Sequence, residues 1–258
     1  MQLFSMLPYL ALGFFLVILC FIEIGRRVGV SHLRRDPDGA RVGIAAIEGA
    51  IFGLLGLMIA FTFSGAAARM EVRRDLIVAE TNAIGTAWLR LDLLPEDAQP
   101  ELRQLFRDYV DQRIAYFHEI QNKVVAAQHD ARAVELQSTI WKKSGAVVKT
   151  MTSVPLGVSE LQAQNDMFDI TTTRGAALEA HPPLAIYGML AVLTLISGLL
   201  IGFGMAGSSK RNWFHSVGYA LVMVSALYLI LDFEFPRAGS IRIDHVDTIL
   251  LDLRKSFD

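Results

Sequence analysis

The sequence has 258 residues, of which 53% are hydrophobic and 19% are charged, and its net charge is −2. An ordinary soluble domain is about one quarter charged, and this near-neutral balance provides no basic field of the kind that binds nucleic acid. The single cysteine, Cys20, excludes an internal disulfide and a cysteine-based metal cluster. Because apolar residues gather toward both ends of the chain and charges in the middle, the ends are where we expect membrane spans.

The first apolar segment covers residues 6–24. No lysine or arginine precedes it and no small-residue cleavage site follows it, so we predict a retained span and not a signal peptide. About 20 apolar residues cross a hydrocarbon core of roughly 30 Å. Three more segments reach that length, at residues 43–67, 184–206 and 213–231. The sequence therefore predicts an all-α integral membrane protein with four transmembrane helices in two hairpins.

The loop after the first segment is rich in arginine, which favours a cytoplasmic position for the short loops. An even number of spans places both termini and the middle region on one side of the membrane. Basic residues also flank the spans on the side of the middle region, and they are nearly as many as the arginines of the first loop. The distribution of charge thus leaves open which side carries the middle region.

The second apolar segment has two distinct faces. Small residues form one face, which is typical of close helix packing: Gly49, Gly53, Gly56, Ala60 and Ser64. A second face is bulky and carries one acidic residue: Glu48, Phe52, Leu55 and Ile59. This second face either lines the axis of an oligomer, where large apolar rings gate a pore by dewetting, or packs against the first segment or lipid.

Acidic residues lie at the ends of the spans, at Glu23, Glu48, Asp232 and Glu234. Near the arginine-rich loop, Glu23 and Glu48 are expected to pair with Arg26, Arg27 or Arg41. The alternative is a vestibule that attracts cations, to which Glu23, Asp232 and Glu234 would contribute.

In the third segment, Gly198 and Gly202 have the spacing of a small-residue pair that lets helices approach closely. Residues 202–207 also match the sequence pattern of a dinucleotide-binding fingerprint. They end an apolar helix and do not follow a strand, so this context does not favour a dinucleotide site.

The middle region is predicted to be a bundle of amphipathic helices outside the membrane. The helix of the second segment continues to Leu94, where Pro95 stops it, with an apolar face of Leu76, Ala79, Ala83, Ala87, Leu91 and Leu94. Further helices are expected from about residue 97 into the 120s, at 131–152 and at 158–178. The expected domains are a first transmembrane hairpin (1–67), an extramembrane helical domain (68–183), a second transmembrane hairpin (184–233) and a C-terminal tail (234–258).

Catalytic chemistry has no candidate residues in this sequence. The six histidines show no metal-binding spacing, and there is neither a nucleophile elbow nor a phosphate-binding loop that ends in Gly-Lys-Ser/Thr. We therefore expect no enzyme activity, no cofactor and no metal.

Several short stretches together resemble the bacterial bestrophin-like family. They are EGAIFGLLGL at 48–57, FTFS at 61–64, RR at 73–74, ETNAIGTA at 80–87, LDLLP at 91–95 and LDFEFPRAGSI at 231–241. The order of parts, two spans, a helical middle and two spans, is also similar.

This resemblance implies a homo-oligomeric ion channel, a pentamer by analogy, in the bacterial inner membrane. Inorganic ions would pass along a pore lined by the second transmembrane helix, with Phe52, Leu55 and Ile59 as candidates for its hydrophobic neck. It also implies a cytoplasmic middle region, against the arginines of the first loop. The alternative function is a non-conducting membrane scaffold or sensor that acts through its helical extramembrane domain.

Overall fold

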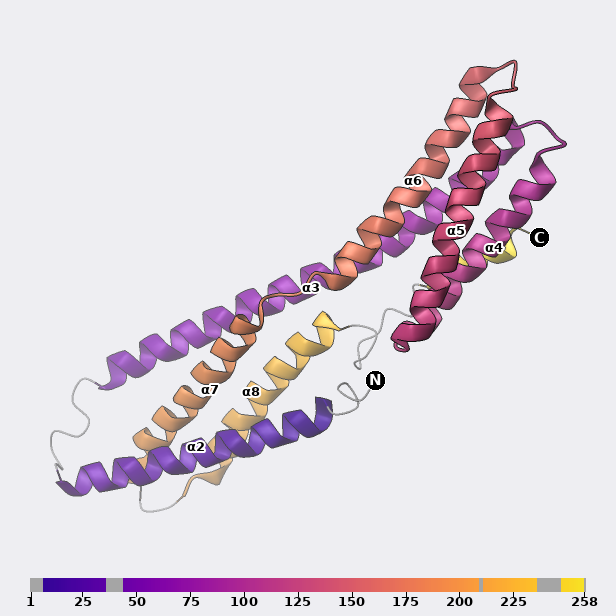
Figure 1. The fold of residues 1–258 in the computed structure, drawn as a ribbon. Coiled ribbons are helices and arrows are strands. Elements are labelled where there is room, and N and C mark those ends of the chain that lie inside the picture. The colour runs from indigo at the N-terminus through magenta and orange to yellow at the C-terminus, as the bar shows by residue number, and fades with distance from the viewer. Residues whose placement is uncertain (1–6, 36–43, 209–210, 236–246, 258) are drawn as a thin grey trace. The chain divides into compact units, whose positions relative to one another are not determined.

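The chain forms two compact units, each built from segments far apart in the sequence (Figure 1). The computed structural model describes residues 7–35, 44–208, 211–235 and 247–257, and within these residues it is helical with no strand, as predicted. One unit, called the span unit here, contains residues 7–68 and 181–235. The other, called the bundle unit, contains residues 69–180 and 247–257.

The span unit contains the long apolar helices. They are α2 (Leu7–Arg35), the first part of α3 (Ile44–Arg90), α7 (Leu184–Gly204) and α8 (Trp213–Glu234), and the 3-10 turn η2 (Met205–Gly207) follows α7. Within the described residues, four helices are long and apolar enough to cross a membrane. The first of them continues eleven residues beyond the predicted end at residue 24, because no proline or other strong breaker interrupts residues 25–35.

The backbones of α2 and α7 touch at glycines. A Cβ atom added to Gly202 would lie 1.9 Å from the carbonyl oxygen of Ile22, and one added to Gly25 would lie 1.9 Å from that of Leu199. At Gly198 the same test gives ordinary contacts, 3.5 Å or more, with Ile22 and its neighbours. The neighbours that the structure gives α2 are α7 and α8, while the predicted pairing of the first two spans as a hairpin stays a prediction.

The bundle unit combines the second part of α3 with the helices of the middle region and the tail. These elements are η1 (Leu91–Leu93), α4 (Gln99–His118), α5 (Lys123–Val148), α6 (Val154–Glu179) and α9 (Thr248–Lys255). Each predicted helix of the middle region has a counterpart here. Its boundaries follow from local chemistry: Pro100 and Pro155 occupy the first turns of α4 and α6, and Asn122 Oδ1 caps α5 by accepting a hydrogen bond from Val125 N.

The helical face that α3 and η1 turn toward the bundle core matches the predicted one in its second half and differs in its first half. Ala87, Leu91 and Leu94 are buried as predicted, whereas Leu76, Ala79 and Ala83 are only half-buried. The buried face instead carries Ile77, Glu80 and Ile84, one residue further along. The prediction was wrong in this first half because it followed apolar residues alone, whereas the buried stripe contains the charged Glu80, which lies among arginines.

The C-terminal helix α9, which the sequence did not predict, completes the bundle core. Phe257 stacks on Trp88 of α3, with ring centroids 3.8 Å apart and planes 4° from parallel. Arg107 of α4 donates to the carbonyl oxygen of Phe257 at 2.6 Å, and Leu250 is buried in the same core. The end of the described chain is therefore an integral part of this unit.

Candidate functional site

One stripe of the apolar part of α3 is buried within the span unit. Leu55, Thr62 and Ala66 are buried, and half-buried residues flank them on either side: Glu48, Ile51, Phe52, Met58 and Ile59. At 100° per residue these side chains form one continuous stripe. Leu55, a predicted pore-lining residue, is only 2% exposed. The bulky face that the sequence singled out is thus turned toward the other helices of the same subunit.

The opposite stripe of α3 is free in the subunit. Its centre carries Gly53, Leu57, Ala60 and Ser64, all of them exposed, and Leu57 is 51% exposed. Gly49 and Gly56 form one flank, where an added Cβ would meet nothing within 4 Å. The other flank carries the bulky side chain of Phe61, which is 66% exposed. This free stripe contains all five small residues that the sequence predicted to pack against a neighbouring helix: Gly49, Gly53, Gly56, Ala60 and Ser64.

Glu23 is held by three arginines. Its carboxylate accepts from Arg26 at 3.1 Å, from Arg27 at 2.9 Å and, across to the start of α8, from Arg211 at 3.0 Å. Two of these are partners that the sequence suggested, while Arg41, the third candidate, lies outside the described residues. Among the described residues, Glu48 Oε1 is buried with no hydrogen-bond partner.

The carboxyl groups at the end of α8 are buried in the span unit. Asp232 and Glu234 are almost completely inaccessible, and Glu234 Oε1 lies 2.9 Å from His181 Nδ1. The His181 ring also packs on Phe235, with centroids 4.7 Å apart. This contact joins the residues before α7 to the end of α8. The sequence analysis did not identify His181 as a partner, and a vestibule formed by these acidic groups stays a prediction.

A buried charged cluster lies in the bundle unit, outside the four apolar segments that the sequence predicts to cross the membrane. Arg113 Nε donates to Glu80 at 2.7 Å, and Arg174 donates both to Glu80 and, at 3.1 Å, to Asp247. The Arg174 guanidinium also sits 3.4 Å from the centroid of the Phe117 ring. Burial alone would raise the pKa of Glu80, but the two arginines hold this pKa below its ordinary value.

The charged cluster therefore connects α3, α4, α6 and the residue that precedes α9. Sequence reasoning missed it, although one signal was available: Glu80 lies between Ile77 and Ile84 at core spacing, and a charge at such a position requires a buried partner.

A second buried polar group lies between α5 and α6, also outside the four predicted apolar segments. Gln164 Nε2 donates to Glu160 Oε1 at 2.7 Å and contacts Ser144 Oγ at 2.6 Å, and all three side chains are fully buried. Among the described residues, Glu160 Oε2 and Gln164 Oε1 have no hydrogen-bond partner. Burial raises the pKa of Glu160 from 4.5 to about 7, so the neutral acid persists to near-neutral pH.

The free energy of unfolding is expected to fall as pH rises from about 4.5 to 7, because folded Glu160 retains a proton that the unfolded chain releases. Over this window the loss would be about 3 kcal/mol, at 1.36 kcal/mol per pH unit. Glu160→Gln should remove this part of the pH dependence and leave the variant more stable than the wild type at pH 8. Urea titrations at pH 5 and pH 8 measure the effect, with the exposed Glu135→Gln on α5 as control. Identical pH slopes for the wild type and Glu160→Gln would contradict the prediction.

Comparison with known proteins places this geometry in a family. A model of the Bestrophin-like domain matches residues 12–247. Two crystal structures of mutant forms of a bacterial bestrophin homologue from Klebsiella pneumoniae are similar, with TM-scores of 0.67 and 0.62 at 14% identity. The first match covers 95% of this chain and 98% of that chain, and the second covers 92% and 99%.

A third crystal structure, described as a membrane protein, is 15% identical with a TM-score of 0.63, and the match covers 93% of this chain and 98% of that chain. At such identities these likenesses establish the fold. Comparison with curated proteins gives no match. Because the domain model covers most of the sequence, the protein belongs to the bestrophin-like family.

Proposed function

We propose that the chain is one subunit of a homo-oligomeric ion channel whose pore is lined by α3. Bestrophins are known as ion channels and not as enzymes, and the family and the fold of this chain both support the proposal. The observation that carries it is the free stripe of α3, which would pack against a second copy of the chain or face a pore.

The two flanks of α3 suit a ring of identical subunits. In a ring, one flank of each subunit meets the opposite flank of the next, so the contact surfaces need to be complementary and not identical. Gly49 and Gly56 on one flank leave room for the bulky Leu54 and Phe61 on the other. Such packing would turn the centre of the stripe, and Leu57 in particular, toward the axis.

A ring of Leu57 side chains would form an apolar constriction that gates by dewetting. The neck that the resemblance implied, at Phe52, Leu55 and Ile59, would instead require α3 to turn by about half a revolution, since Leu57 lies 200° from Leu55 at 100° per residue. By analogy with bestrophins, the assembly would be a pentamer in the bacterial inner membrane, with inorganic ions as its cargo.

The experiment is ion flux through purified protein in liposomes, with separate dye assays for potassium and chloride. Leu57→Ala should raise the flux severalfold, because it widens the constriction. Leu55→Ala is the matched control: it removes the same atoms from a buried position, so it should lower thermal stability without raising the flux of folded oligomer.

Three other results would count against parts of the proposal. Higher flux in Ile59→Ala with no change in Leu57→Ala would assign the pore to the bulky face. A folded oligomer with no flux in any variant would favour the scaffold or sensor. A particle image without cyclic symmetry would exclude the ring.

A further inference from the structure

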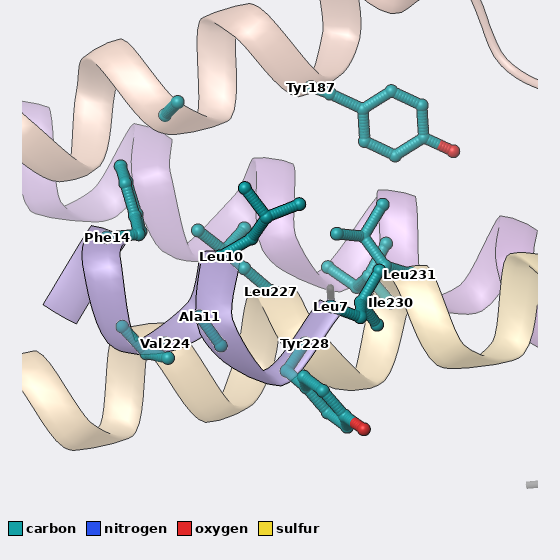
Figure 2. Close-up of a pocket in the computed structure, with 11 residues that line it drawn as sticks. Leu7, Leu10, Ala11, Phe14, Tyr187, Val224, Leu227, Tyr228, Ile230 and Leu231 are labelled. Atoms are coloured by element: carbon teal, nitrogen blue, oxygen red, sulfur yellow. The ribbon is translucent and has the colours of Figure 1, made fainter. Parts of the chain in front are cut away.

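A half-open cavity of about 210 Å³ lies in the span unit, among the first turns of α2, the start of α7 and the last turns of α8. Figure 2 shows side chains of α2 projecting between α7 and α8, with Tyr187 on one side and Val224 and Leu227 on the other. The residues that line it are Leu7, Leu10, Ala11, Phe14, Tyr187, Ala191, Val224, Leu227, Tyr228, Ile230 and Leu231.

The lining selects a hydrocarbon. Apart from the hydroxyl groups of Tyr187 and Tyr228, the side chains around the cavity are apolar. Apolar cavities of about 150 Å³ stay dry and take up molecules such as benzene. A larger one has room for a stretch of alkyl chain and offers water no set of hydrogen-bond partners.

The surroundings identify the source of that hydrocarbon. Leu10 lines the cavity and is also exposed at the surface of the unit, next to the exposed Tyr9. On helices that cross a membrane, such exposed apolar side chains contact lipid tails, so a tail reaches the opening without entering water. Tyr187 and Tyr228 lie near the ends of their helices, and tyrosines in such positions mark headgroup depth.

We propose that this cavity binds one acyl chain of a membrane phospholipid, whose polar end lies beside Tyr187 and Tyr228. The bound chain packs against the turn of α8 that leads into Glu234, the partner of His181. Occupancy therefore stabilises the contact between the start of α7 and the end of α8. This inference does not depend on ion conduction, because none of its measurements uses flux.

The test uses vesicles that contain a phospholipid with a diazirine at the end of one acyl chain. Illumination should attach the lipid to peptides covering residues 7–14 and 224–231. This labelling should be saturable, and excess unlabelled phospholipid should reduce it. Ala191→Phe fills the cavity and should reduce labelling severalfold. Val192→Phe is the matched control, since this neighbouring residue is 55% exposed and absent from the lining; its labelling should equal that of the wild type.

A second matched pair guards against a folding defect in Ala191→Phe. Ala11 also lines the cavity and Leu12 is an exposed neighbour, so Ala11→Phe should lose the label and Leu12→Phe should retain it. Each variant is checked by size exclusion before labelling. Equal labelling of the filled and unfilled variants, labelling without saturable competition, or cross-links from these residues to a second copy of the chain would overturn the proposal.

Discussion

Glu80→Gln is expected to lower the free energy of unfolding of the bundle unit by about 3–5 kcal/mol, as removal of one partner from a buried ion pair does. The substitution keeps the size and shape of the side chain but removes the charge that both Arg113 and Arg174 face. Two guanidinium groups would then be buried without the carboxylate that neutralises them. Asp247 still contacts Arg174 at 3.1 Å, and Asp130 contacts Arg113 at the longer distance of 3.4 Å, so the larger loss is expected at Arg113.

A carboxylate on the same helix provides the control. Glu71 is exposed and pairs with Arg74 one turn away, so Glu71→Gln should change stability by less than about 1 kcal/mol. The measurement is urea unfolding of the detergent-solubilised protein, followed by far-ultraviolet circular dichroism. If both variants unfolded at the wild-type urea concentration, the buried cluster would not have the stabilising role that its geometry indicates.

Gly202→Val is expected to separate α2 from α7 and cost about 3 kcal/mol or more, at the upper end for overpacking. The nearest atom to the new Cβ is the backbone carbonyl oxygen of Ile22, at 1.9 Å, and not the flexible end of a side chain. The two helices must therefore move apart. Because Gly25 meets Leu199 in the same way one turn further on, the displacement would open both contacts.

Gly188→Ala is the control for this second prediction. It lies on the same helix, but an added Cβ there meets nothing within 4 Å. Alanine is a better helix former than glycine by about 1 kcal/mol, so this variant should be as stable as the wild type or slightly more stable. The fraction of monodisperse protein after heating, read by size exclusion, distinguishes the two. If Gly202→Val and the wild type kept equal fractions of monodisperse protein after heating, the helices would be able to move apart at little cost in stability.

Length and period were enough to predict the four apolar helices and the helices of the middle region, because hydrocarbon thickness and the 3.6-residue repeat are properties of single segments. The packing partners of those helices could not be predicted in the same way. The packing of Gly25 and Gly202 joins residues far apart in the chain, and no single segment encodes that pairing.

The faces of the spans were harder to predict than the spans themselves. Lipid tails and protein interiors are both apolar, so the size of a side chain does not tell which of them it contacts. For this reason the sequence left open whether the bulky Leu55 faces a pore, lipid or the other helices of its own subunit, where it is in fact buried. Glu80 shows the converse in the bundle unit. Charged side chains are mostly exposed, and its buried partners Arg113 and Arg174 lie on other helices, so the pattern of one helix does not identify them.

The docking of α9 fixes an order of events during synthesis. The core around Trp88 contains Leu250 and Phe257, which the ribosome adds only after both α7 and α8 have been made. Helices α3 to α6 therefore emerge before the residues that close their hydrophobic interior. The last two spans must leave the ribosome, on their way into the bilayer, while the bundle unit is still open at Trp88.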